Sequence, residues 1–116
     1  MKYVLLLYEN EAAWNQQPEA ENEAELREYL ALDEALNREG VQRGGEALLQ
    51  SESATCVRVR DEGLLVTDGP FAETREQLGG YYEIEADDLD AAIGVARRIP
   101  AARKGTVEIR PVMTFE

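Results

Sequence analysis

The pattern of apolar and polar positions predicts a strand at the start of the chain. Residues 2–8 form a run that is apolar at both odd and even positions after Lys2. A short run with two apolar faces is typical of a central strand covered on both sides. Asn10 then opens a polar stretch around Trp14, which we interpret as one short helical turn before Pro18.

The first long helix is predicted over residues 19–39. Pro18 and the acids that follow it are a helix start signal, and Gly40 is placed to end the helix. One side of this helix is apolar and carries Leu26, Tyr29, Leu30 and Leu36. Asp33 interrupts that side, and we expect it to reach solvent or to bind a nearby backbone N–H, because a buried carboxylate needs a partner. The acids of this helix are expected to form a solvated face.

A second helix is predicted after Asp87, the expected N-cap. Its apolar residues recur at helical spacing and are Leu89, Ala92, Ile93, Ala96 and Ile99. Arg97 and Arg98 suit the C-terminal end of the helix dipole, and Pro100 is expected to stop the helix.

The other strands are predicted at residues 41–49, 54–60, 64–67, 79–86 and 105–115. Gly44-Gly45 indicates a bulge or a close backbone approach, and residues 61–63 indicate a hairpin connection. The order β-α-β-hairpin-β-α-β matches the ferredoxin-like split βαβ plan. We therefore predict an α+β fold, in a single domain over residues 1–116, with an antiparallel sheet and an added hairpin.

The doubly apolar first strand also predicts a homodimer. In the split βαβ plan both helices cover one face of the sheet, and no element remains to cover the other face. The economical cover is a second copy of the same sheet, packed face to face.

Composition limits the chemistry. The chain has 24 acidic and 12 basic residues, a net charge of −12, which counts against nucleic acid or an anionic membrane as a direct partner. It has no histidine and one cysteine, so no cysteine metal cluster and no cofactor is expected. The apolar start is too short for a signal peptide, and no stretch approaches the roughly 18 apolar residues of a membrane span. We expect a cytoplasmic protein.

Three segments carry a family resemblance: GGEAL at residues 44–48, TDGPFAETREQLGGYY at 67–82 and DDLDAA at 87–92. Together with the opening and closing runs, they resemble the YCII-related family, in its branch named for the Asp-Gly-Pro-Phe motif. The resemblance implies a ferredoxin-like fold that dimerises into an α/β barrel with a small-molecule cleft between helix and sheet. Some relatives carry a proposed His–Asp pair in that cleft. This chain has no histidine and so lacks the pair, and Tyr29 lies near the position where the histidine of those relatives is expected. Members of this branch often resemble proteins encoded beside sigma factors, which suggests a regulatory setting.

The Asp68–Phe71 turn has a structural and a functional interpretation. In the structural one, Asp68 accepts hydrogen bonds from backbone N–H groups within the next few residues. In the functional one, Asp68 is an acid or base at a cleft mouth, with Glu73 and Arg75 nearby in sequence. The structural interpretation is favoured.

Arginines are the candidate anion ligands. Arg58 shares a strand face with Cys56, and Arg110 interrupts the apolar pattern of the last strand. An arginine in a dimer cleft could bind a carboxylate or phosphate bidentately, and Arg75 is a third candidate. The alternative is an ion pair with one of the many acids, and it is favoured.

Three functions remain open at this point. The first is a module that binds or senses a small molecule. The second is an enzyme with histidine-free acid–base chemistry, for which the candidates are Asp68, Asp33, Tyr29 and Glu73. The third is an accessory protein that docks onto a regulatory partner such as a sigma factor.

Overall fold

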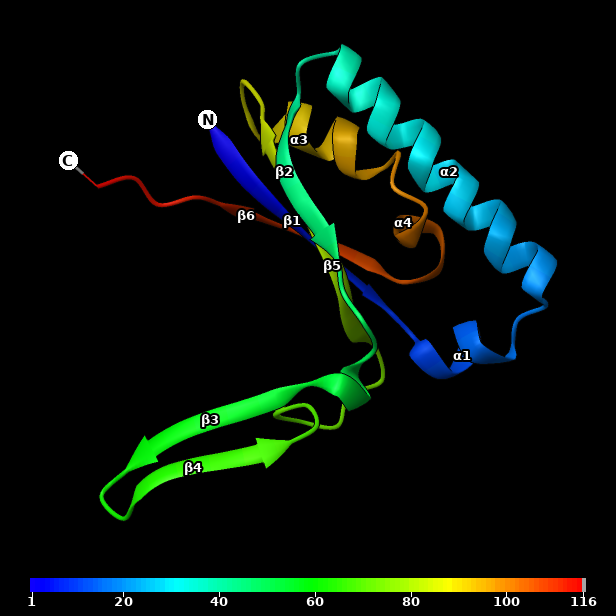
Figure 1. Ribbon diagram of the computed structural model, residues 1–116. Helices are drawn as coiled ribbons and strands as arrows, with labels where there is room; N and C mark the ends of the chain where they lie inside the picture. Colours follow the sequence, from blue (N-terminus) through cyan, green and yellow to red (C-terminus); the bar gives the residue numbers. More distant parts are fainter. Residues whose placement is uncertain (116) are drawn as a thin grey trace.

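The computed structural model describes residues 1–115 and has helices on one side of a four-stranded sheet, with a separate two-stranded hairpin (Figure 1). The elements in chain order are β1 (Lys2–Glu9), α1 (Glu11–Gln16), α2 (Glu19–Arg38), β2 (Gln42–Ala47), the 3-10 turn η1 (Ser51–Ser53), β3 (Thr55–Arg60), β4 (Gly63–Asp68), β5 (Gln77–Glu85), α3 (Leu89–Ala96), α4 (Ala101–Lys104) and β6 (Thr106–Pro111).

The main sheet has the strand order β2-β5-β1-β6, and all its pairings are antiparallel. This order is that of the ferredoxin-like split βαβ plan, so the predicted α+β fold is confirmed. The first strand is central, between β5 and β6, as its doubly apolar pattern indicates.

The hydrophobic core lies between the sheet and the helices. Alternate residues of β1 point into it, namely Tyr3, Leu5 and Leu7. Leu36 of α2 and Ile84 of β5 meet them and are almost fully buried. Burial of each aliphatic side chain of this size contributes about 1.5–3 kcal/mol, so the α2–sheet contact is a main source of stability.

Helix α2 begins at Glu19 as predicted and ends at Arg38, one residue before the predicted end at Glu39. Pro18 is its N-cap residue, and Gly40 follows its end with φ of 73°, a left-handed conformation that favours glycine. The buried side of α2 differs from the prediction. Leu26 and Leu30 are 54% and 64% exposed, whereas Glu25 is only 4% exposed. The expectation that every acid of this helix is solvated is therefore wrong for Glu25.

The second predicted helix differs at both ends. Its N-cap is Asp88, one residue after the predicted Asp87, and the Asp88 carboxylate accepts a hydrogen bond from the Ala91 amide at 2.9 Å. α3 ends at Ala96, and Pro100 opens the short helix α4 instead of stopping α3. Proline fits the first turn of a helix because that position needs no amide donor.

The strands follow their predicted ranges with small shifts. The Gly44-Gly45 prediction is confirmed, because the register of β2 against β5 shifts between Gln42 and Gly44. Gly63, predicted as a loop residue, is instead the first residue of β4, with φ of 111°. The last strand ends at Pro111, before the predicted residue 115.

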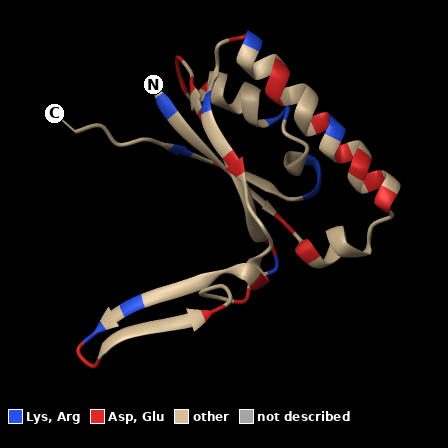
Figure 2. Cartoon of the chain, in the orientation of Figure 1, with Lys and Arg blue, Asp and Glu red and all other residues tan. Residues whose placement is uncertain are grey.

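The hairpin β3–β4, which we call the arm, is not paired with the main sheet. In Figure 1 it projects away from the helices. Its register places one all-apolar set on a single face, and every member is exposed: Val57, Val59, Leu64 and Val66. Apart from charges near its ends and on β3, the arm is uncharged (Figure 2). An isolated two-stranded hairpin is marginally stable in water, so this face favours contact with another surface.

The face of the main sheet that the helices leave uncovered has a partly apolar centre. Val4 and Leu6 of β1 lie on it, and both are half-buried. Polar residues flank them, including Glu83 and Arg110, the cross-strand partners of Val4. Among residues 1–115, no helix is both long and apolar enough to cross a membrane.

Candidate functional site

A cleft of about 600 Å³ opens between α2 and the sheet, with α1 at one end. This volume lies within the range of small-molecule sites. Strands β2 and β5 form its floor, where two glycines, Gly45 and Gly80, allow their backbones to approach closely. A Cβ at Gly80 would meet the Glu46 carbonyl oxygen at 2.9 Å, so a larger residue would force these strands apart. The floor therefore has no side chain at these two positions.

Helix α1 is fastened to the turn beside the cleft. The Glu11 carboxylate accepts hydrogen bonds from the amide and the hydroxyl of Ser51, both at 2.7 Å. Asn15 and Gln50 exchange two side-chain hydrogen bonds, at 2.9 and 3.2 Å. Trp14, in the same helix, lines the cleft. These contacts hold the α1 end of the cleft in place.

Two tyrosines form a polar part of the wall. The Tyr82 hydroxyl donates to Asp33 Oδ1 at 3.1 Å, and the Tyr29 hydroxyl accepts from the Ala101 amide at 3.2 Å. Burial raises the pKa of both phenols, and nearby carboxylates raise it further. Both phenols are therefore protonated at neutral pH and can act as hydrogen-bond donors.

The cleft is acidic. Its lining includes five carboxylates, and within residues 1–115 it includes no lysine or arginine: the acids are Glu9, Glu11, Glu25, Asp33 and Glu46. Glu11 accepts hydrogen bonds from Ser51, and Asp33 accepts one from the Tyr82 hydroxyl. Glu9 and Glu25 are not fully satisfied.

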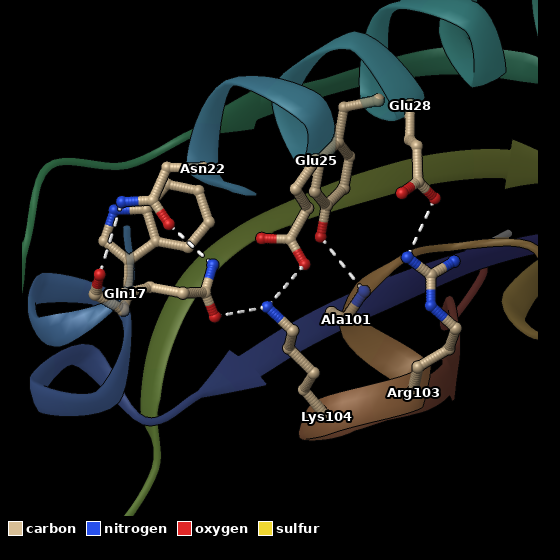
Figure 3. Close-up of polar contacts among 9 residues, drawn as sticks. Gln17, Asn22, Glu25, Glu28, Ala101, Arg103 and Lys104 are labelled. Atoms are coloured by element: carbon tan, nitrogen blue, oxygen red, sulfur yellow. Dashed lines mark hydrogen bonds and ion pairs between the residues drawn. The ribbon is translucent and has the colours of Figure 1, made fainter. Parts of the chain in front are cut away.

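Glu25 is the most buried of these acids. Lys104 Nζ of α4 lies 3.3 Å from its Oε1 and also donates to Gln17 Oε1 at 2.6 Å (Figure 3). Its Oε2 is buried and has no hydrogen-bond partner in the described part of the chain. The ion pair with Lys104 therefore covers one oxygen of this carboxylate, and the other oxygen is buried without a donor among the described residues.

Glu9, at the end of β1, has a similar environment. Its Oε1 is buried without a partner among the described residues. Burial raises the pKa of this carboxyl, the charge of Glu25 raises it further, and Lys104 partly opposes the shift. Gln42 Oε1 is a third buried acceptor without a partner in the same cleft.

The mouth of the cleft is apolar. Four leucines surround it and are all substantially exposed: Leu26, Leu30, Leu48 and Leu49. Exposed leucines around a pocket with a few inward polar groups are typical of a ligand site. The two leucines of α2, expected to face the core, line this mouth instead.

Of the seven residues proposed from the sequence, the structure brings two into the cleft. Tyr29 and Asp33 both line it. Asp33 was expected to reach solvent or a backbone N–H, and it binds the Tyr82 hydroxyl instead, because α2 lies directly over β5. Glu73 and Arg75 lie outside it, around a shallow polar hollow near α1 and η1.

The other proposed residues lie elsewhere. Arg58 is on the arm, and Arg110 is on the uncovered face of the main sheet. Asp68 ends β4 and is exposed. Its expected hydrogen bonds from following backbone amides are not present in the described chain. The Gly69 amide instead donates to the carbonyl of Ala54, the residue before β3, at 2.6 Å, which extends the pairing of the two arm strands into the start of this segment.

Glu9, Glu25, Gln42 and Tyr82 are cleft residues that sequence reasoning did not propose. A signal for Glu25 exists in the spacing. It precedes Tyr29 by four positions and Leu32 by seven, which places all three on one helix face. A signal for Glu9 is weaker, since an acid directly after an apolar strand is common at strand ends.

Comparison with known proteins gives one family. The model of the YCII-related domain matches residues 1–116. An uncharacterized protein from Rhizobium meliloti (strain 1021) is 31% identical over 118 residues, which cover 100% of this chain and 95% of that protein.

Proposed function

The chain belongs to the YCII-related family, and on that premise we propose that it binds a small molecule in the cleft between α2 and the sheet, as a homodimer. The observation that carries the binding proposal is the cleft itself. It combines a ligand-sized volume, an apolar mouth and buried polar groups that lack partners. Such a combination is costly for stability, and occupation by a ligand offsets that cost.

The test of binding is a thermal-shift screen of the purified protein against a library of small metabolites. A ligand of the cleft raises the melting temperature, because it binds the folded state alone. The effect should be lost in Gly80→Leu, whose side chain enters the floor, provided that this variant still folds by circular dichroism. A library without any stabilising compound would contradict the binding proposal.

The surface area of the chain supports the homodimer. A folded monomer of 13.0 kDa is expected to expose about 6,300 Å², and this chain exposes 8334 Å². Its radius of gyration of 16.3 Å also exceeds the roughly 13 Å of a compact domain of this length. The excess of about 2,000 Å² per chain is the size that an obligate dimer interface buries.

The two apolar surfaces that lack cover suggest how the copies meet. One is the face of the arm with Val57 and Val66, and the other is the centre of the uncovered sheet face, with Val4 and Leu6. The arm extends toward the side of the sheet opposite the helices (Figure 1). We propose a two-fold dimer in which each arm packs against its partner's uncovered sheet face.

Light scattering coupled to size exclusion tests the dimer. The parent protein should elute as a dimer at micromolar concentration, and Val66→Glu should make it a monomer. Leu65→Glu is the matched control, because Leu65 is adjacent but lies on the other face of the arm. A monomeric parent, or equal effects of both substitutions, would overturn the proposed interface.

A histidine-free acid–base reaction is a second candidate function, and the environment of Glu9 favours it. Burial raises the pKa of this carboxyl and so favours its protonated form, which is the form a general acid needs. Mass spectrometry of a bound compound after incubation separates the two functions. A recovered compound of unchanged mass and isomeric form supports binding alone, and conversion that is lost in Glu9→Gln supports catalysis.

A further inference from the structure

The buried polar atoms without hydrogen-bond partners indicate the class of ligand. All three buried side-chain atoms without partners in residues 1–115 are oxygen acceptors: Glu9 Oε1, Glu25 Oε2 and Gln42 Oε1. All three residues line the same cleft. A ligand that satisfies them must therefore bring hydrogen-bond donors and not acceptors.

The negative charge of the cleft narrows the class of ligand further. Glu25 is 4% exposed, and Lys104 forms an ion pair with one of its oxygens. The pKa of Glu9 is raised by burial and, next in size, by the charge of Glu25, which disfavours a second negative charge beside it. A positively charged donor would relieve both the repulsion and the missing hydrogen bonds, whereas an anion would be repelled by five carboxylates.

A bare metal ion fits this site poorly. Among residues 1–115 no three acidic or cysteine side chains are close enough to hold one. Calcium and magnesium need six or more oxygen ligands in a compact shell. The wall is instead broad and apolar, with Trp14, Leu26 and Leu30 among its residues. An organic cation with an apolar body matches both parts of the cleft.

Resting on the proposed function, we propose that the ligand of this cleft is an amine with an apolar body, whose ammonium group is held by Glu9 and Glu25. The body of the amine packs against Trp14 and the leucines of the mouth. Gln42 supplies a neutral acceptor, and the protonated Tyr29 lies on the same wall.

A matched set of probes tests the charge requirement. The set is 2-phenylethylamine, 2-phenylethanol and 3-phenylpropanoate, which share an aromatic body and differ in the charge of the end group. Trp14 is the sole tryptophan of the chain and lines the cleft, so its fluorescence reports binding directly. At neutral pH the amine should bind more tightly than the alcohol, by about tenfold at least, and the carboxylate should bind most weakly of the three.

Three substitutions locate the binding group. Glu9→Gln and Glu25→Gln keep the shape of the side chain and remove its charge. Each should weaken the binding of the amine about tenfold and leave the affinity for the alcohol unchanged. Glu28→Gln is the control, because Glu28 is on the same helix and pairs with Arg103 outside the cleft (Figure 3). Its affinity for the amine should stay within about twofold of the parent. If Glu25→Gln fails to fold, Glu9→Gln alone decides the point.

The outcomes separate this inference from the function on which it rests. Equal binding of the amine and the alcohol, or an amine affinity unaffected by Glu9→Gln, would overturn the cation assignment and leave ligand binding intact. Failure of the amine to bind, with hits of other chemistry in the metabolite screen, would do the same. No binding by the amine and no hit in the screen would overturn both.

Discussion

At the scale of single residues, Glu9 and Glu25 differ from most of the 24 acids because they hold buried oxygens without a donor. An unsatisfied buried acceptor typically costs about 1–3 kcal/mol. Asp33 of α2, whose carboxylate also lines the cleft, avoids this cost because it accepts a hydrogen bond from the Tyr82 hydroxyl. The two glutamates are therefore positions where stability and ligand binding are expected to conflict.

Glu9→Gln should raise the melting temperature at neutral pH. The folded pKa of Glu9 is raised above its ordinary value of 4.5, mainly by burial, so its contribution to stability is present below that value and lost as pH rises through the folded pKa. Glutamine removes this loss, with a gain of about 1 kcal/mol or less after solvent screening. The gain should shrink to zero as the pH falls below about 4.5. Melting curves over this pH range check it, and a lower melting temperature at neutral pH would contradict it.

Two aspartates at helix and turn positions should differ in their effect on stability. Asp88→Ala removes the hydrogen bond to the Ala91 amide and should cost about 1 kcal/mol. Asp68→Ala should change the free energy of unfolding by less than about 0.5 kcal/mol, because its exposed carboxylate accepts no hydrogen bond from the described residues. Urea unfolding measures both, and a costly Asp68→Ala would restore the structural role that its turn position suggested.

At the scale of elements, close approach of β2 and β5 shapes the floor of the cleft. Gly45 has φ of 139°, and a Cβ there would collide with the Tyr81 carbonyl oxygen. The bulge in β2 lies directly before Gly44-Gly45, where Arg43 is the extra residue between Gln42, opposite Ile84, and Gly44, opposite Glu83. Helix α2 then lies over the bulged strands, and Glu39, directly after α2, accepts two hydrogen bonds from Arg98, which lies two residues after α3.

Alanine at two glycines should have opposite effects. Gly45→Ala should destabilise the protein by about 2 kcal/mol or more, from the left-handed φ and the collision with the backbone of β5. Gly94→Ala should stabilise it by about 0.5–1 kcal/mol, because Gly94 is exposed in α3 and a Cβ there meets nothing within 4 Å. Chemical denaturation of both variants checks the sign. Equal effects would mean that the floor tolerates a side chain.

At the scale of the whole molecule, the arm adds exposed surface that the hydrophobic core of the chain does not cover. Within residues 1–115 its strands pair only with each other, and its apolar face is exposed. The principal extents of 49 × 49 × 19 Å describe a flat, open outline rather than a sphere. A second copy would cover both the arm and the uncovered sheet face, which is the physical basis of the proposed dimer.

The melting temperature of the parent protein should therefore rise with protein concentration. Folding and association are coupled in an obligate dimer, so dilution favours the unfolded state. Val66→Glu should melt at a lower temperature that does not depend on concentration, since charge on the apolar face of the arm prevents association. Calorimetry of both proteins over a hundredfold range of protein concentration, on the order of micromolar, makes the measurement. A constant melting temperature of the parent would count against the dimer.

The sequence by itself determined the features that depend on local periodicity. The double apolar pattern of residues 2–8 placed β1 at the centre of the sheet, and Pro18 and Gly40 set the ends of α2. The sequence also indicated Tyr29 and Asp33 as candidate site residues, and both line the cleft. Caps, turns and alternation act over a few residues, so a linear pattern contains them.

Only the tertiary structure decided which acids are buried together. Glu9 ends β1 and Glu25 is in the second turn of α2, and their meeting depends on how α2 lies across strands paired over long sequence distances. The same holds for Tyr82 and Asp33, 49 positions apart, and for the arm, whose separation from the sheet no alternation pattern indicates. The burial of a carboxylate depends on every element packed around it, and that packing is a property of the whole fold rather than of any one segment.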